Sequence, residues 1–190
     1  MKATLQDFMV RTKADFDRLP EDGFWEVVDG RAMPLPANDI PHQELCVVLL
    51  ELFRKGLKAL GYGFVFPSVN VFAPPARPFL GEVQNRVPDL VVSKWRPEKG
   101  FEVGHPPELV IEILSTRRGN VERTEKLDDY ARAGIGEYWI VDPFDGAIEV
   151  YILRQGEYVL RETVSQGSLS PEGFPGLTID LRGIWDALAH

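Results

Sequence analysis

Two carboxylates in strand-like segments are the residues of this sequence best suited to chemistry. Glu112 stands within "PELVIEILS", where apolar neighbours on both sides predict a strand buried on both faces. Asp89 follows Pro88 in "RVPDLVVS", where the preceding predicted strand begins, a position that also suits a simple turn residue. Burying a glutamate is costly unless it is paired, protonated or bound to a cation. Two acids on adjacent strands would repel each other, and a hard divalent cation such as Mg²⁺ or Mn²⁺ would relieve that repulsion.

The next predicted helix, "NVERTEKLDDYARAG", adds a lysine to the two acids. At 100° per residue, Leu127, Tyr130 and Ala131 define the buried face of this helix. Lys126 lies about 90° from the centre of that face, at its boundary. There its stem can lie on apolar surface while its ammonium group enters a site. The alternative, which spacing alone favours, is a solvated lysine paired with Glu122 at i, i+4.

A short basic segment follows the Glu112 strand. Arg117, Arg118 and Arg123 lie close to Lys126 in sequence. Basic side chains beside metal-binding acids would neutralise the phosphates of a nucleic-acid backbone. The alternative is a solvated loop, because acids are interspersed among these residues. Arg117 and Arg118 are therefore candidate substrate-binding residues.

Composition narrows the class of protein. The chain has 190 residues and a formal net charge of −8, which disfavours DNA binding through bulk charge but leaves a local basic surface or bound metal ions possible. No apolar run reaches the ~18 residues of a membrane span, and the N-terminal residues lack the apolar core of an export signal. We expect a cytoplasmic protein. The single cysteine, Cys46, excludes an internal disulfide and a cysteine-based zinc site, and it is expected to be a buried inert thiol.

The elements that must position these side chains can be predicted by pattern. Asp29-Gly30 is a hairpin signal within "FWEVVDGRAMPLP". A long helix is expected from Pro41 to Leu60, with Asp39 as its cap and Gly61 as its stop. Strands are expected in 63–73, 87–94 and 107–115, then the helix with Lys126, a three-stranded meander over 137–164, and a last short strand and helix. This order predicts one α/β domain over residues 1–190, with one central mixed sheet flanked by helices.

The helix from Pro41 to Leu60 also bears on assembly. Its apolar residues cover more than the roughly 100° stripe that one sheet face needs. An exposed remainder would form an apolar patch that monomers seldom tolerate, so we expect a homodimer or a higher homo-oligomer. The alternative is that the meander or the C-terminal segment "GIWDAL" covers the helix within one chain.

Several of these segments together resemble the Uma2 family of restriction-endonuclease-like proteins. The resemblance is carried by "RVPDLVVS", "PELVIEILS", "RTEKLDDYARAGIGEYWIVDP" and "IEVYIL", and extends to "FWEVVDGRAMPLP" and "PHQEL". It spans about Phe24 to Leu181. It implies the fold of the PD-(D/E)xK nucleases, with Asp89 and Glu112 as metal ligands and Lys126 as the basic partner.

The sequence departs from the standard superfamily pattern in one place. The usual lysine lies two residues after the second acid, where this chain has Leu114. The resemblance implies that the lysine has moved to the following helix, and that Glu26 and His42 could complete the site, with His42 a further candidate substrate-binding residue. The sequence therefore predicts a metal-dependent endonuclease that hydrolyses DNA. The alternatives are a binding or assembly domain that lost activity, and chemistry on another phosphoester.

Overall fold

The computed structural model describes residues 8–21, 23–36, 39–116, 120–182 and 184–188, which form three β-sheets and four helices. The largest sheet has six strands, in the order β11 (Glu157–Val164), β10 (Ala147–Arg154), β9 (Glu137–Asp142), β8 (Leu109–Ile113), β7 (Leu90–Ser93) and β4 (Phe64–Pro67). The β8 and β9 strands are parallel and the other neighbours are antiparallel. The sheet is therefore mixed, as the sequence predicted.

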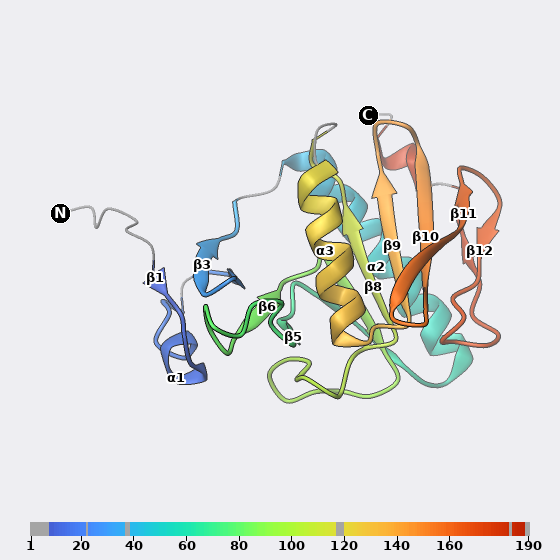
Figure 1. Cartoon of the computed structure of the whole chain (residues 1–190). Coiled ribbons are helices and arrows are strands. Elements are labelled where there is room, and N and C mark those ends of the chain that lie inside the picture. Colours follow the sequence, from blue (N-terminus) through green and yellow to red (C-terminus); the bar gives the residue numbers. More distant parts are fainter. Residues whose placement is uncertain (1–7, 22, 37–38, 117–119, 183, 189–190) are drawn as a thin grey trace.

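A second sheet lies beside the first, on its N-terminal side (Figure 1). Its antiparallel strands follow the order β1 (Phe8–Met9), β3 (Arg31–Pro34), β2 (Trp25–Val28), β6 (Gln84–Arg86) and β5 (Val71–Ala73). A small third sheet joins β12 (Ser168–Leu169) to β13 (Ile179–Asp180).

The helices are α1 (Lys13–Phe16), α2 (Ile40–Leu60), α3 (Asn120–Ala133) and the 3-10 helix η1 (Trp185–Leu188). The ends of α2 confirm the prediction. The Asp39 side chain accepts a hydrogen bond from the His42 N–H, and Gly61 ends the helix in the left-handed region at φ 85°. The predicted hairpin is also present, with Asp29 and Gly30 both at positive φ between β2 and β3.

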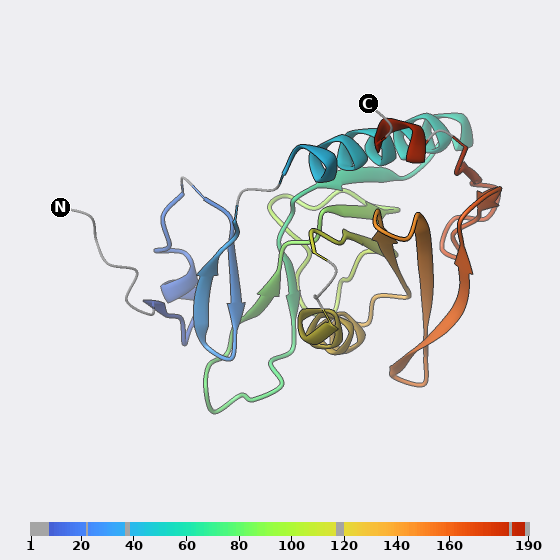
Figure 2. The ribbon, with the colours of Figure 1, turned by 90° about the horizontal axis from the view of Figure 1, so that it is seen from above.

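The six-stranded sheet is covered by α2 on one face and by α3 on the other (Figure 2). Side chains of β8 alternate between these layers, as a buried strand requires. Leu109 and Ile111 join the core beneath α2, whereas Val110 joins the core beneath α3. Glu112 has the same parity as Val110, so its side chain enters the α3 layer. The alternation of β8 thus places this carboxylate opposite α3.

The expectation of one central sheet needs a correction. The segment 63–73 does not continue in one sheet: β4 belongs to the six-stranded sheet, and β5 belongs to the five-stranded sheet. The change occurs after Pro67, where Ser68 has φ 48° and its N–H donates to the Asp89 carbonyl. Two strands so close in sequence looked continuous because both are runs of apolar, strand-forming residues, and such a pattern does not reveal a change of partner.

The apolar face of α2 is covered largely within the chain. The buried Ile184 and the partly buried Trp185, which begins η1, join the cluster formed by α2 and the sheet. Ile40 and Val47 are the large apolar side chains that stay exposed among the described residues of α2. The predicted apolar patch is therefore mostly absent from the described surface, because the C-terminal segment covers it. The covered helix no longer supports a homodimer, which stays a prediction.

Candidate active site

The carboxylate of Asp89 is held where β7 begins. Its Oδ2 accepts a hydrogen bond from the Ile113 N–H at 2.7 Å, which links it to the end of β8. The same oxygen lies 3.1 Å from Nε2 of His42, in the first turn of α2. Burial lowers the pKa of His42, but the hydrogen bond to Asp89 and the surrounding carboxylates together raise that pKa above its ordinary value. His42, predicted to complete the site, does contact one of its two acids.

Glu112 is buried at the same end of the sheet. Its Oε1 accepts a hydrogen bond from the Tyr130 hydroxyl at 2.5 Å, and its Oε2 lies 3.0 Å from the Lys126 ammonium. Burial raises the pKa of Glu112 to about 7, which Lys126 opposes and which the charges of Asp89 and Glu26 increase. Burial and the neighbouring acids thus favour the protonated form of this carboxyl, and a cation bound in place of the proton would relieve the repulsion.

Lys126 is buried rather than solvated, with 9% of its surface exposed. The buried positions of the described part of α3 are Lys126, Asp129, Tyr130 and Ala133. The predicted buried face, centred on Leu127, Tyr130 and Ala131, was therefore rotated from the true one. Apolar periodicity misplaced it because the surface facing α3 carries acids and not only apolar groups. The alternative of a solvated Lys126 is wrong.

Glu26 reaches this site from β2 of the second sheet. Its Oε2 lies 2.9 Å from the Arg86 guanidinium, and its Oε1 accepts from the Val87 N–H at 3.1 Å. The same Oε1 is 3.9 Å from the Lys126 ammonium. The second sheet therefore delivers a third carboxylate beside the Glu112–Lys126 pair, as the position of Glu26 in the sequence suggested.

Arg86 and Asp129 are site residues that sequence reasoning missed. Arg86 Nε donates to the Asp129 carboxylate at 2.6 Å, and Asp129 also accepts from the Gln84 side chain at 2.8 Å. Burial lowers the pKa of Arg86, but Glu26 and Asp129 raise it well above its ordinary value, so the guanidinium stays charged. Arg86 stands in the polar run "QNR", which gives no sign of burial. The one signal in the sequence is its closeness to Asp89, three residues later, which places Arg86 near the predicted site.

Cys46 lies beside His42 and Asp89 at the same end of the sheet. Its Sγ is 3.6 Å from Nδ1 of His42, and potential ligand atoms of His42, Cys46 and Asp89 all lie within 4.8 Å of one another. Burial, with the charges of Asp89 and Glu112, raises the pKa of the Cys46 thiol to about 12. The thiol is therefore protonated at neutral pH, in keeping with the inert role expected of it, although it is only partly buried.

The donors present suit a hard divalent cation. Asp89 and Glu112 supply carboxylate oxygens, and Glu26 lies close enough to Glu112 to raise its pKa. Mg²⁺ is commonly held by one or two carboxylates and keeps several waters. Cys46, the single cysteine of the chain, is the one thiol that could serve a softer metal, beside His42 and Asp89. The acids of this site thus fit the predicted Mg²⁺ or Mn²⁺.

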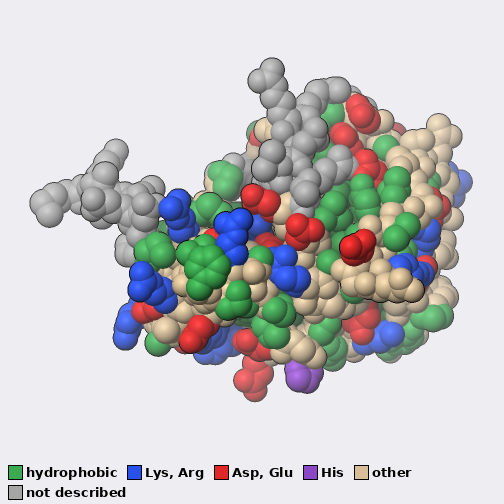
Figure 3. Space-filling model, in the orientation of Figure 1, with side chains coloured by type: hydrophobic (Ala, Val, Ile, Leu, Met, Phe, Trp, Pro, Cys, Tyr) green, Lys and Arg blue, Asp and Glu red, His purple; other side chains and the backbone are tan. Residues whose placement is uncertain are grey.

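The predicted basic segment lies largely outside the described residues. Arg117 and Arg118 lie outside the described residues, and the side chain of Arg123 is likewise not described. Over the described part of the face that carries α3, acidic and basic side chains are interspersed (Figure 3). The substrate-binding roles of the two arginines therefore stay predictions.

These features define a restriction endonuclease-like protein: a mixed sheet between helices, with acids meeting a lysine at one end. The chain belongs to the Uma2 family, described as "Putative restriction endonuclease", which matches residues 14–182. A solved structure with the same fold is titled as a putative nuclease of DUF820 from Anabaena variabilis. It is 20% identical, with a TM-score of 0.71, and the match covers 93% of this chain and 98% of that one.

The other comparisons add little to this assignment. No curated protein matches the chain. None of the described helices is both long enough and apolar enough to cross a membrane.

Proposed function

We propose that this protein is a Mg²⁺- or Mn²⁺-dependent endonuclease that hydrolyses DNA phosphodiester bonds. The observation that carries the proposal is the buried Glu112–Lys126 pair, 3.0 Å apart, beside the carboxylates of Asp89 and Glu26. A single ion pair does not need the two further acids, which raise the pKa of Glu112. A site for a cation and a phosphate needs them.

Asp89 and Glu112 are the proposed metal ligands. A bound cation would make water a better nucleophile at neutral pH and stabilise negative charge on the phosphate oxygens. The Ile113 N–H and His42 orient Asp89 toward the β8 end of the sheet. The Tyr130 hydroxyl fixes one oxygen of Glu112. These contacts hold both carboxylates in place before any cation binds, which lowers the cost of assembling the site.

Lys126 is the proposed basic partner. Its ammonium group lies between Glu112 and Glu26, at 3.0 and 3.9 Å. With a cation held by Asp89 and Glu112, the ammonium of Lys126 would be placed to orient the attacking water or to contact the scissile phosphate. The buried Arg86–Asp129 contact supports the second sheet at this point and keeps Glu26 in reach of Lys126.

A second function, a binding or assembly domain without activity, has two observations in its favour. Glu112 is already paired within the chain by Lys126 and Tyr130, and the net charge of −8 opposes nucleic-acid binding. A domain that had lost activity could retain this pair for stability alone. It would bind no divalent cation at Asp89 and Glu112.

Plasmid nicking tests the proposed function directly. Supercoiled plasmid is incubated with the protein and Mg²⁺ or Mn²⁺, and conversion to open-circular DNA is followed on a gel. We expect nicking that stops in EDTA and in Glu112→Gln, which removes the charge at nearly constant shape. Nicking by Glu112→Gln at the wild-type rate would assign the activity to a contaminant or to another site. No nicking by wild-type protein in either metal would favour the second function.

A further inference from the structure

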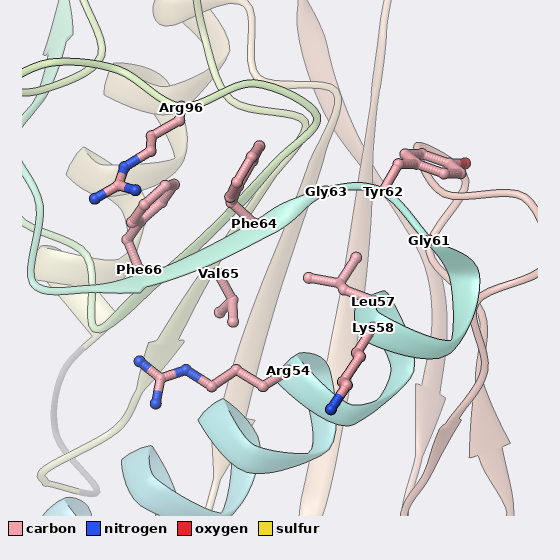
Figure 4. A pocket seen from close by; sticks show the side chains of 10 residues that line it. All are labelled: Arg54, Leu57, Lys58, Gly61, Tyr62, Gly63, Phe64, Val65, Phe66 and Arg96. Carbon is pink, nitrogen blue, oxygen red and sulfur yellow. The ribbon is translucent and has the colours of Figure 1, made fainter.

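A cavity at the far end of α2 has features that the proposed active site does not use. It has a volume of about 650 Å³ and lies where α2 ends and β4 begins (Figure 4). Three basic side chains, Arg54, Lys58 and Arg96, belong to its lining, and no acidic residue does. None of the three has an ion-pair partner among the described residues. Three unpaired cations around one cavity are unexpected in a protein with a net charge of −8.

Aromatic rings complete the lining. The rings of Phe64 and Phe66, on one face of β4, stack with centroids 6.1 Å apart and planes 17° from parallel. Phe64 is 40% exposed, so part of its side chain is open to solvent. In Figure 4 the guanidinium groups of Arg54 and Arg96 extend the same way on either side of β4, with Arg96 beside Phe66. Cations beside exposed rings suit phosphates joined to unstacked bases.

The cavity is connected to the active site by two elements. β4 runs from Phe64 at the cavity to Pro67, which pairs with Leu90, the residue after Asp89. Phe64 and Pro67 are roughly 10 Å apart along the strand, at ~3.3 Å per residue. α2 runs from His42 at the site to Arg54 at the cavity, about 18 Å along the helix at ~1.5 Å per residue. A single strand leaving the site would therefore have to span roughly 10–18 Å to reach the cavity.

We infer that this cavity binds single-stranded nucleic acid, with phosphates at Arg54, Lys58 and Arg96 and a base on the exposed ring of Phe64. The choice of nucleic acid rests on the proposed nuclease function. The choice of a single strand rests on the rings, because stacking on them requires unpaired bases. The cavity would then hold the strand at a distance from the acids that cut it.

The competing occupant is an acidic peptide. β4 is the last strand of its sheet among the described residues, so its outer edge could pair with an added strand. A peptide would use the basic side chains and the backbone of β4. It would not need the exposed ring of Phe64.

The test is fluorescence anisotropy with a labelled oligothymidylate in EDTA, where no cleavage occurs. Arg54→Gln/Arg96→Gln is expected to weaken binding about tenfold and to reduce the slope of log Kd against log salt by about 1.4, at ~0.7 per lost phosphate contact. Phe64→Ala is expected to weaken binding about tenfold without changing the slope. The matched control is Lys55→Gln, an exposed lysine of the same helix that does not line the cavity. It is expected to bind like wild type.

Three results would overturn the inference. Equal weakening by Lys55→Gln would indicate a general charge effect. Competition by polyglutamate as strong as that by unlabelled oligothymidylate would assign the cavity to acidic peptides. Unchanged binding by Phe64→Ala, with equal affinity for duplex and single strand, would remove the stacking role.

Binding is measured without metal, so the inference and the nuclease function can fail separately. A protein that nicks plasmid but binds DNA equally well with and without the cavity substitutions refutes only this inference. A protein that binds through the cavity but never nicks refutes only the nuclease.

Discussion

Two buried glutamates on neighbouring parallel strands show how much the partners of a buried acid matter. Glu112 on β8 and Glu137 on β9 are 6% and 1% exposed, and burial raises the pKa of both. Glu137 accepts hydrogen bonds from the Trp139 indole and the Glu172 N–H, both at 2.7 Å. Glu112 instead faces the Lys126 ammonium and the Tyr130 hydroxyl.

The difference lies in what a cation could replace. The hydrogen-bond donors to Glu137 are neutral N–H groups, one of them from the backbone, and its nearest cation, the half-buried Arg161 guanidinium, lies farther away at 3.8 Å. At Glu112 the chief partner is a lysine on a flexible stem, and Asp89 and Glu26 add negative charge. Burial alone therefore does not identify a functional carboxylate. What distinguishes Glu112 from Glu137 is a buried ammonium at 3.0 Å together with two further acids, Asp89 and Glu26, which raise its pKa.

Removing the displaceable partner should have the largest effect. Lys126→Ala is expected to lower the plasmid-nicking rate by about 10²–10⁴-fold, because the group that acts on water or phosphate is gone. Metal binding, titrated at alkaline pH, should not weaken, since the proposed ligands remain and no ammonium competes for Glu112. Lys55→Ala, an exposed lysine of α2, serves as the charge-matched control. Equal rates for Lys126→Ala and wild type would make Lys126 a structural residue, comparable to the partners of Glu137.

The raised pKa of Glu112 predicts a pH-dependent stability in the metal-free protein. A carboxyl whose folded pKa is about 7, against 4.5 unfolded, adds stability that is complete below pH 4.5 and is lost as the pH rises through 7. The loss amounts to at most about 3 kcal/mol.

Urea unfolding in EDTA across this range measures the effect. Glu112→Gln should lack this component, so its free energy of unfolding should gain on that of wild type as the pH rises. Parallel pH profiles for the two proteins would show that Glu112 is already ionised in the fold.

The smallest effect is expected at the other glutamate. Glu137→Gln keeps one oxygen acceptor but turns an amide N–H₂ toward a donor, which should destabilise the fold by about 1–3 kcal/mol. Urea unfolding near neutral pH measures it. Plasmid nicking and its metal dependence should stay at the wild-type level under conditions where the variant is folded. A loss of nicking in folded Glu137→Gln would show that the two glutamates are not distinct in role.

Local patterns in the sequence predicted most elements that hold the site. The cap at Asp39, the stop at Gly61 and the turn at Asp29-Gly30 are set by short-range backbone chemistry, and all three are present. The burial of Glu112 was likewise evident, because its apolar neighbours define a strand covered on both faces. These features depend on residues a few positions apart.

What the sequence did not yield depends on distant contacts. The buried side of α3 carries Lys126, which faces Glu112 and Glu26, and Asp129, which pairs with Arg86, so its burial departs from apolar periodicity. The pairing of Arg86 with Glu26 joins residues 60 positions apart, and neither sits in a sequence context that reveals it. The contacts that build the charged part of the site are tertiary, and they cannot be predicted from helix or strand periodicity.

Calorimetric titration of Mn²⁺ into wild type, Glu112→Gln and Glu137→Gln tests the central claim most directly, namely that Glu112 is a metal ligand and Glu137 is not. All three proteins should be folded and compared at one alkaline pH, where Glu112 is ionised. The account predicts saturable binding of equal affinity by wild type and Glu137→Gln, and no measurable binding by Glu112→Gln. Unchanged Mn²⁺ affinity in Glu112→Gln would contradict it.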